Sequence, residues 1–165
     1  MDNYRISKHL DKISKLLEIT EANPFKIRAY QNGSRVIRFL KEDAKELLEK
    51  KQLGKVKGIG KGLLLDITEF VENGSSETYE TLAKEIPQGI FEIFQIKGLG
   101  VKKVKVILDK LQISTLGELE YACLENRLVD LDGFGSKTQE SVLQNIQFLK
   151  RNKGDKLLNV AFEES

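Results

Sequence analysis

Apolar residues along most of the chain recur every three or four positions, which is the spacing of an amphipathic α-helix. The first such segment predicts a helix over residues 3–20, with its apolar positions at Ile6, Leu10, Ile13, Leu16 and Leu17. Asn23 and Pro24 are typical of a helix start, because Asn can cap the first turn and Pro is tolerated at its first position. The helix that follows is predicted to turn these residues toward a core: Phe25, Ala29, Val36, Ile37 and Leu40.

Glycine and proline divide this helical pattern. Asn32-Gly33 is predicted to interrupt the second helix, since Gly costs about 1 kcal/mol relative to Ala inside a helix. A short third helix is predicted over residues 42–51. At Ile86-Pro87-Gln88-Gly89 the proline disfavours helix at the residue before it and the glycine favours a turn, so we place a domain junction there. The resulting prediction is a domain over residues 1–85, a smaller domain over residues 86–150 and a tail over residues 151–165.

One short pattern occurs three times along the chain. It consists of an apolar residue, a polar residue, Gly-apolar-Gly and then a helical stretch. The copies are VKGIGKGLLLDI (56–67), IKGLGVKKVKVI (96–107) and LDGFGSKTQESV (131–142), with the glycine pairs Gly58 and Gly60, Gly98 and Gly100, and Gly133 and Gly135. The first glycine of each pair can take the left-handed conformation that ends a helix. The apolar residue between the glycines is expected to pack between the incoming and outgoing helices.

The second glycine of each pair predicts an anion site. It has no side chain, so a phosphate can approach the backbone closely. The N–H groups of the outgoing helix's first turn lack intrahelical partners and lie at the positive end of the helix dipole. Such a site would contact the nucleic-acid backbone rather than base edges. For a single copy a plain helix–helix turn is the alternative; three copies in one context favour binding.

The three copies of the pattern differ in the charged residues around them. The lysines around the first two turns are Lys55, Lys57 and Lys61, and then Lys97, Lys102 and Lys103. The third turn has Asp130 and Asp132 before it and only Lys137 after it, so we predict the weakest anion site there. The chain has 27 basic and 25 acidic side chains, and its net charge of +2 therefore hides basic turns beside acidic segments.

Composition excludes several classes of protein. Cys123 is the only cysteine and His9 the only histidine, which excludes a disulfide framework, a Cys-based zinc site and a His-rich metal centre. His9 falls on the polar side of the predicted first helix, and Cys123 is expected to be buried and inert. No apolar run approaches the roughly 20 residues of a membrane span, and the N-terminus lacks the apolar segment of a signal peptide. We predict a cytoplasmic protein that has no membrane partner.

These repeated elements are helix-hairpin-helix motifs, and the chain resembles the N-terminal region of family X DNA polymerases, the DNA polymerase beta family. It looks most like the bacterial members that carry a C-terminal PHP phosphoesterase domain. The segments that carry the resemblance are NPFKIRAYQNGSRVI (23–37), GIGKGLLLDITEFVENG (58–74), IPQGIFEIFQIKGLGVKKVKVI (86–107) and LENRLVDLDGFGSKTQESVLQNI (124–146). The resemblance implies an all-α chain of two small helical domains built around the three motifs, lyase-type over residues 1–85 and fingers-type over residues 86–150. Residues 151–165 look like the lead-in to a palm domain, where Mg²⁺ would bind, and that palm is absent from these 165 residues.

The resemblance also implies a function. It implies sequence-independent binding to gapped, nicked or 5′-phosphorylated DNA through backbone phosphates, as the DNA-gripping part of a DNA-directed DNA polymerase in DNA repair, including base excision repair. The chain is then a nucleoid-associated monomer and is not catalytic by itself. Two alternatives stay open: a residual 5′-deoxyribose-phosphate lyase, and a protein–protein scaffold built from the hairpins.

Individual positions of the family carry over in part. Lys26 and Tyr30 match its phosphate-pocket positions, and Tyr30 would either stack on DNA or pack with its polar tip outward. Arg28 shares one side of the second helix with Arg35 and Arg38, which is either a solvated face or a phosphate-facing stripe. The lysine that forms the Schiff base in the family's lyases is replaced by Asp66, whose carboxylate cannot form an imine. A lyase would therefore need a displaced nucleophile such as Lys61.

One cofactor follows from the resemblance alone. In the family, the hairpin of the second portion can bind a monovalent cation through backbone carbonyls. The corresponding carbonyls here belong to Lys97 and Leu99, which would hold Na⁺ or K⁺. No other cofactor is expected in this chain.

Overall fold

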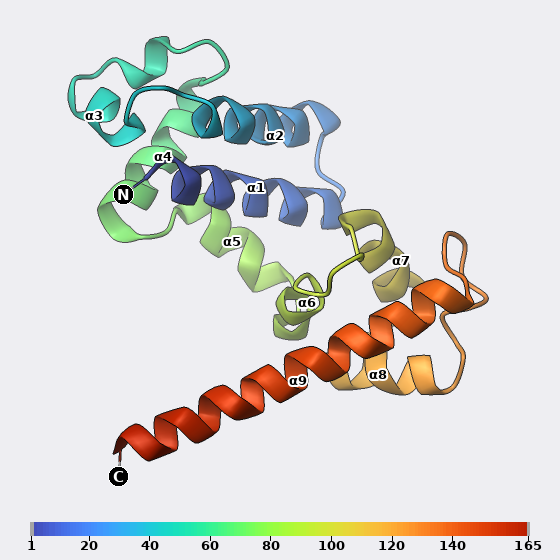
Figure 1. The fold of residues 1–165 in the computed structure, drawn as a ribbon. Helices are drawn as coiled ribbons and strands as arrows, with labels where there is room; N and C mark the ends of the chain where they lie inside the picture. The colour runs from blue at the N-terminus through green and yellow to red at the C-terminus, as the bar shows by residue number, and fades with distance from the viewer. Residues whose placement is uncertain (1, 165) are drawn as a thin grey trace. The chain divides into compact units, whose positions relative to one another are not determined.

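The described residues of the computed structural model lie in helices, turns and loops, and none of them in a strand (Figure 1). The structure describes the backbone of residues 2–164 and the side chains of residues 2–152. The predicted all-α class is therefore confirmed. Within this described part, no helix is both long enough and apolar enough to cross a membrane.

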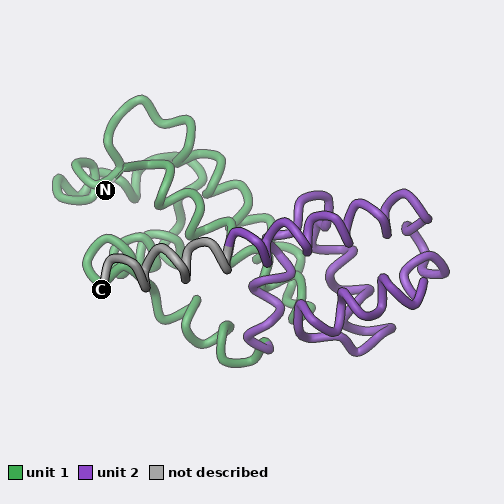
Figure 2. The backbone as a smooth tube through the Cα atoms, turned by 60° about the horizontal axis from the view of Figure 1, so that its bottom comes forward, with its two compact units in different colours: residues 1–86 green, residues 87–165 purple. Residues whose placement is uncertain are grey.

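The chain forms two compact units, residues 1–86 and residues 87–165 (Figure 2). The boundary lies between Ile86 and Pro87, inside the segment where the sequence places a junction. Ile86 has extended backbone, with φ −113° and ψ 133°, which is the conformation that a following proline favours. Helix α9 (Ser136–Glu164) runs through the segment predicted as a tail, whose side chains from residue 153 on lie outside the described residues.

Unit 1 is built on two antiparallel helices, α1 (Asn3–Ile19) and α2 (Pro24–Arg38), which pack along their length (Figure 1). Each begins at a side-chain cap. Asp2 accepts a hydrogen bond from the N–H of Arg5 at 2.9 Å, and Asn23 caps α2 in the same way. All the apolar positions that periodicity predicts for α1 are buried: Ile6, Leu10, Ile13, Leu16 and Leu17.

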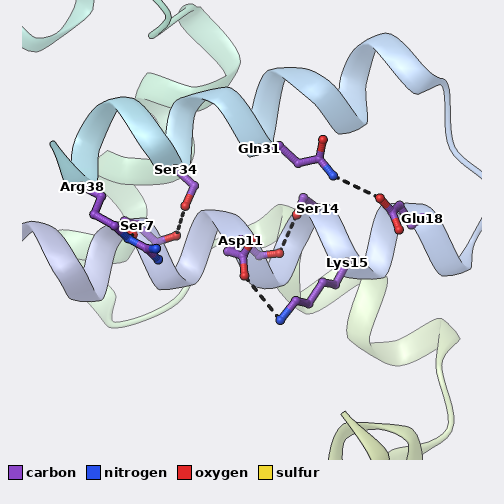
Figure 3. Close-up of polar contacts among 8 residues, drawn as sticks. All are labelled: Ser7, Asp11, Ser14, Lys15, Glu18, Gln31, Ser34 and Arg38. Atoms are coloured by element: carbon purple, nitrogen blue, oxygen red, sulfur yellow. Dashed lines mark hydrogen bonds and ion pairs between the residues drawn. The ribbon is translucent and has the colours of Figure 1, made fainter. Parts of the chain in front are cut away.

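Polar contacts fix the register between α1 and α2 (Figure 3). The Ser34 hydroxyl donates to the carbonyl oxygen of Ser7 at 2.7 Å, and Nε of Arg38 donates to the Ser7 hydroxyl at 3.1 Å. Near the other end, the Gln31 amide donates to the Glu18 carboxylate at 3.1 Å. Arg38 is thereby tied to α1, so it does not project freely with the other arginines of α2.

The inward face of α2 differs from the prediction. Phe25 is 76% exposed and Ala29 is also exposed. The helix also continues through Asn32-Gly33 without interruption. Gly33 lies where Leu63 crosses α2, and a Cβ there would lie only 2.7 Å from Cδ1 of Leu63. The residues of α2 that are buried are Tyr30, Gly33, Ser34 and Ile37.

The remaining elements of unit 1 pack against this helical pair. They are α3 (Ala44–Glu49), the 3₁₀ helix η1 (Leu53–Lys55), α4 (Lys61–Asn73) and α5 (Glu77–Glu85). Ile67 and Phe70 of α4 join Leu10 and other residues of α1 in one hydrophobic core. The face of α1 opposite its charged residues is therefore covered, and burial of this core supplies the main stabilisation of the unit.

Unit 2 consists of α6 (Gln88–Ile93), α7 (Val101–Leu111), α8 (Leu116–Leu124) and α9. Its buried residues come from every one of these helices and include Ile90, Ile107, Leu119 and Ile146. Gly89 lies inside α6, not in the turn that the sequence suggested. It is needed because α6 approaches the chain before α8 closely: a Cβ on Gly89 would lie 2.1 Å from the carbonyl oxygen of Ser114.

Candidate nucleic-acid interface

The three glycine turns share one backbone geometry. They are Val56–Gly60, Ile96–Gly100 and Leu131–Gly135, and each leads directly into a helix. In each turn the residue between the glycines donates its N–H to the carbonyl three residues earlier, at 3.1 Å, 3.3 Å and 3.0 Å respectively. The carbonyl of the second glycine then accepts the first bond of the outgoing helix, at 2.9 Å, 3.0 Å and 2.9 Å. The sequence repeat is therefore a structural repeat.

The first glycine of each turn has the left-handed backbone that the sequence predicts. The φ angles of Gly58, Gly98 and Gly133 are 99°, 92° and 82°. A residue with a Cβ is strained in this region, which explains the glycine without any ligand. The apolar residue that follows packs inward: Ile59 and Leu99 are buried, and Phe134 is half-buried.

Neither backbone strain nor a close contact requires a glycine at the second position of each pair. Gly60 and Gly100 are the N-cap residues of α4 and α7, with φ angles of −83° and −79° that any residue adopts. A Cβ on either of them, or on Gly135, would meet no heavy atom within 4 Å. The absence of a side chain here leaves open the amide groups of the first helical turn, which have no partner within their helix.

The first turn rests on α2 and is bordered by lysines. A Cβ on Gly58 would lie 3.0 Å from Cγ2 of Val36 and 3.1 Å from Nδ2 of Asn32, so α2 supports this turn directly. Arg28 is exposed one helical turn before Asn32, and its guanidinium carbon lies 5.7 Å from the ring centroid of Phe25. The lysines at the turn are all exposed: Lys55, Lys57 and Lys61.

The second turn is held against α9. The side-chain amide of Asn145 donates to the carbonyl oxygen of Lys97 at 3.1 Å, a contact between residues 48 positions apart. Lys97 and Lys102 are exposed, whereas Lys103 is half-buried. The predicted lysines of this turn therefore differ in their freedom to move.

The third turn is well built despite its weaker charge. Gln139 is 8% exposed; its carbonyl oxygen accepts the N–H of Leu128 at 3.2 Å, and its amide donates to the side chain of Asn126 at 2.8 Å. Gln139 therefore fastens the chain that enters the turn. Lys137 is exposed in the first turn of α9, and Phe134 faces the ammonium group of Lys103 at 5.7 Å from the ring centroid.

Two hydroxyl residues beside the third turn are not predicted from the sequence. Thr138 and Ser141 line a pocket that they share with Lys137 and with residues of the second turn. Helical spacing could have placed them on one side of α9, since they lie three positions apart. The lysines of the second turn that complete this pocket could not be paired with them from the sequence.

The placing of Tyr30 among the DNA-contacting residues is corrected by the structure. Tyr30 is 6% exposed, and its hydroxyl donates to a carboxylate oxygen of Asp66. The other carboxylate oxygen of Asp66 accepts the hydroxyl of Thr78 at 2.8 Å. Burial and this hydrogen bond raise the pKa of Tyr30 above its ordinary value. Tyr30 therefore belongs to a buried polar network and has no face available for a base.

Lys26 lies at a different pocket, next to acids. This pocket, of about 330 Å³, is lined by Lys26 together with the side chains of Glu69 and Glu77. Two carboxylates beside one ammonium group make a poor environment for a 5′-phosphate. The structure thus places Lys26 apart from the glycine turns and does not bring it together with an accessible Tyr30.

His9 and Cys123 are both buried. Periodicity predicts His9 on the polar side of its helix, and the structure corrects this. His9 is 6% exposed, its ring stacks on Phe70 with ring centroids 4.3 Å apart, and its Nε2 forms a hydrogen bond with the hydroxyl of Ser76 at 2.8 Å. Burial lowers the pKa of His9 to about 4. Burial likewise raises the pKa of the Cys123 thiol to about 11, so this thiol is unreactive at neutral pH.

Comparison with known proteins agrees with these motifs. Residues 1–76 match the family model of a helix-hairpin-helix domain. The chain is also 33% identical, over 139 residues, to the DNA polymerase/3′-5′ exonuclease PolX of Bacillus subtilis (strain 168). That match covers 84% of this chain and 24% of the relative, so this chain spans about a quarter of that protein's length. The resemblance to a bacterial family X polymerase is confirmed.

Proposed function

We propose that this chain binds DNA through backbone phosphates at its glycine turns, without reading base sequence. The observation that carries the proposal is the second glycine of each turn, since neither backbone strain nor packing within the protein requires a glycine there. A phosphate that approaches the first-turn amide groups does require it. The exposed lysines beside the first two turns supply the opposite charge.

The relative indicates the setting of this binding. PolX of Bacillus subtilis is described as a DNA polymerase and 3′-5′ exonuclease. We propose that the present chain is the DNA-gripping part of such a polymerase in DNA repair, with gapped or nicked DNA as its substrate. The buried Tyr30 and the acids near Lys26 argue against a 5′-phosphate pocket at that site. We therefore expect a gap to raise affinity more than a 5′-phosphate does.

Substitution of the second glycines tests the proposal. Gly60→Ala and Gly100→Ala have space and an allowed backbone, so both should fold, with a loss of stability below about 1 kcal/mol because Ala is a poorer N-cap than Gly. Each should lower affinity for gapped DNA about tenfold, because the new methyl group blocks one charge-assisted phosphate contact. Fluorescence anisotropy over a salt series measures this, with a slope of log affinity against log salt that reports the phosphates bound.

Gly117→Ala is the matched control for this experiment. Gly117 lies in α8, away from the three turns in sequence, and a Cβ there also meets no heavy atom within 4 Å. Its DNA affinity should equal that of the unsubstituted chain. Unchanged affinity in Gly60→Ala and Gly100→Ala would refute phosphate binding at the turns and would favour the protein–protein scaffold.

The lyase alternative finds no support at its expected position. Asp66 is 2% exposed and both its oxygens accept hydrogen bonds, so this site holds a structural carboxylate. We expect no covalent adduct when the chain is treated with borohydride in the presence of an abasic-site oligonucleotide. An adduct that maps to Lys61 would instead establish a displaced nucleophile.

We further propose a monovalent cation at the carbonyls of Lys97 and Leu99. The Lys97 carbonyl already accepts the Asn145 amide, and a carbonyl oxygen has a second lone pair for a cation. Replacing K⁺ or Na⁺ by tetramethylammonium at constant ionic strength should then weaken DNA binding. Equal affinity in all three salts would exclude the cation.

A further inference from the structure

The pocket between the second and third turns is built from both hairpins. It has a volume of about 290 Å³, roughly ten times the share of one water in the liquid, which leaves room for a phosphate and bridging waters. No acidic side chain is among its described lining residues. They are Lys97, Gly98 and Lys103 from the second hairpin and Lys137, Thr138, Ser141 and Val142 from the third.

Lys103 is held in place by the third hairpin. Its side chain starts on α7, yet its ammonium group lies 5.7 Å from the centroid of the Phe134 ring, at the third turn. A cation near an aromatic face is attracted to it, and a half-buried stem limits the freedom of the chain. Lys103 therefore presents its charge at the junction of the two hairpins and loses little entropy when it binds an anion.

The two hairpins are also fixed to each other through α9. Asn145 bonds the Lys97 carbonyl at 3.1 Å, one helical turn beyond Ser141. Val142, between these two, is 2% exposed and belongs to the core of unit 2. The lining of the pocket is therefore set by contacts that exist without a ligand.

We propose that the second and third hairpins share a single phosphate site. In it Lys97, Lys103 and Lys137 bind one phosphate of a DNA strand, and the hydroxyls of Thr138 and Ser141 donate hydrogen bonds to its oxygens. This rests on the proposed DNA binding and assigns to the third turn a role that its own charge does not predict. Three lysines from the two hairpins therefore converge on one anion.

The number of phosphates bound is the quantity to measure. The variants Lys103→Gln, Lys137→Gln and their combination are compared with the unsubstituted chain of 165 residues by anisotropy on gapped DNA over a salt series. If both lysines bind one phosphate, the double variant should lower the salt slope by no more than about 0.9, because Lys97 also binds that phosphate; if each lysine binds its own phosphate, the slope should fall by about 1.8. The two changes in affinity should also be less than multiplicative in the double variant.

Lys110→Gln is the matched control. Lys110 lies in the last turn of α7, is exposed and is not among the pocket's lining residues. It should leave both the affinity and the slope almost unchanged. Circular dichroism melting of every variant checks that the helices remain folded.

The possible results distinguish the shared phosphate site from the wider proposal that the chain binds DNA. A slope change of about 1.8 in the double variant, or no effect of Lys137→Gln, overturns the shared site while DNA binding stands. An unsubstituted chain that shows no salt-dependent binding overturns both. Duplexes with and without a 5′-phosphate identify the ligand: a loss confined to the phosphorylated duplex indicates a terminal phosphate, and a loss on both indicates an internal one.

Discussion

Asp66 and its two hydroxyl partners show how a buried polar group is kept in a small helical unit. The carboxylate lies in α4 and is almost fully buried, a position that is unfavourable without hydrogen bonds. Tyr30 reaches it from α2 and Thr78 from α5, so three helices meet at one carboxylate. Asp66 is thus a structural link between three helices of unit 1.

Removal of this carboxylate should destabilise the protein. Asp66→Ala leaves the hydroxyls of Tyr30 and Thr78 without their acceptor, and we expect the free energy of unfolding to fall by about 3 kcal/mol. Thr78→Val removes only one donor and should have a smaller effect, about 1 kcal/mol. Urea unfolding followed by circular dichroism measures both. A change below about 0.5 kcal/mol for Asp66→Ala would contradict the structural role.

His9 should make stability depend on pH. Burial, partly opposed by the charge of Asp66, lowers its pKa to about 4, whereas in the unfolded chain the value is 6.5. Between these values the unfolded chain binds a proton that the folded chain does not, so stability is complete well above pH 6.5 and falls as the pH decreases through 6.5 toward 4.

The expected change in stability is small and falls in a pH range where His9 titrates. From pH 7 to pH 5.5 the free energy of unfolding should fall by about 1 kcal/mol. His9 is the only histidine, and carboxylates titrate mainly near pH 4, so this window reports on His9. His9→Gln should remove the dependence in urea titrations at the two pH values. The same fall in His9→Gln would assign it to another group.

At the scale of elements, close contacts with another segment of the chain explain two of the glycines. Gly33 lets α4 pack on α2, and Gly89 lets α6 pack on the segment before α8. Neither position has a left-handed backbone. The helix break predicted at Gly33 and the turn predicted at Gly89 are therefore both wrong. The glycine is there because another part of the chain occupies the place of its side chain.

Gly89→Ala should therefore destabilise unit 2. Its Cβ would lie 2.1 Å from the Ser114 carbonyl oxygen and 2.8 Å from Cα of Thr115, and neither backbone atom can move aside cheaply. We expect a loss of about 2 kcal/mol or more in thermal or urea unfolding. Gly62→Ala is the control: in α4 its Cβ meets nothing within 4 Å, and the better helix former should stabilise by up to about 1 kcal/mol. Equal effects of the two substitutions would show that helix propensity, not the contact, decides.

At the scale of the whole molecule, a destabilising substitution in one compact unit should lower the stability of that unit and leave the other unit folded. The hydrogen-bond partners of Asp66, Tyr30 and Thr78, belong to unit 1, and the atoms that crowd Gly89 belong to unit 2. In hydrogen exchange, Asp66→Ala should lower amide protection in residues 2–86 and spare residues 87–152. Gly89→Ala should produce the converse pattern. Protection lost evenly over the chain in either variant would show one cooperative unit instead of two.

The sequence predicted the local structure well and the contacts between distant segments poorly. Helix α1, its buried positions and the backbone of all three glycine turns follow from spacing and from the properties of glycine over a few residues. The burial of Tyr30 and His9 could not be predicted from the sequence, because the burial of each residue depends on partners that are distant in the chain. Tyr30 meets Asp66 36 positions away, and His9 meets Ser76 67 positions away.

The candidate site divides in the same way. The glycine pairs and most of the lysines could be identified from the chain alone, because conformational freedom and charge are properties of single residues and their neighbours. Only the tertiary structure brings Lys103 close to Phe134 and places Lys137 in one pocket with Lys97, since these contacts join the second hairpin to the third. Periodicity and backbone sterics therefore determine the helices and turns, whereas packing between helices decides which charges act together.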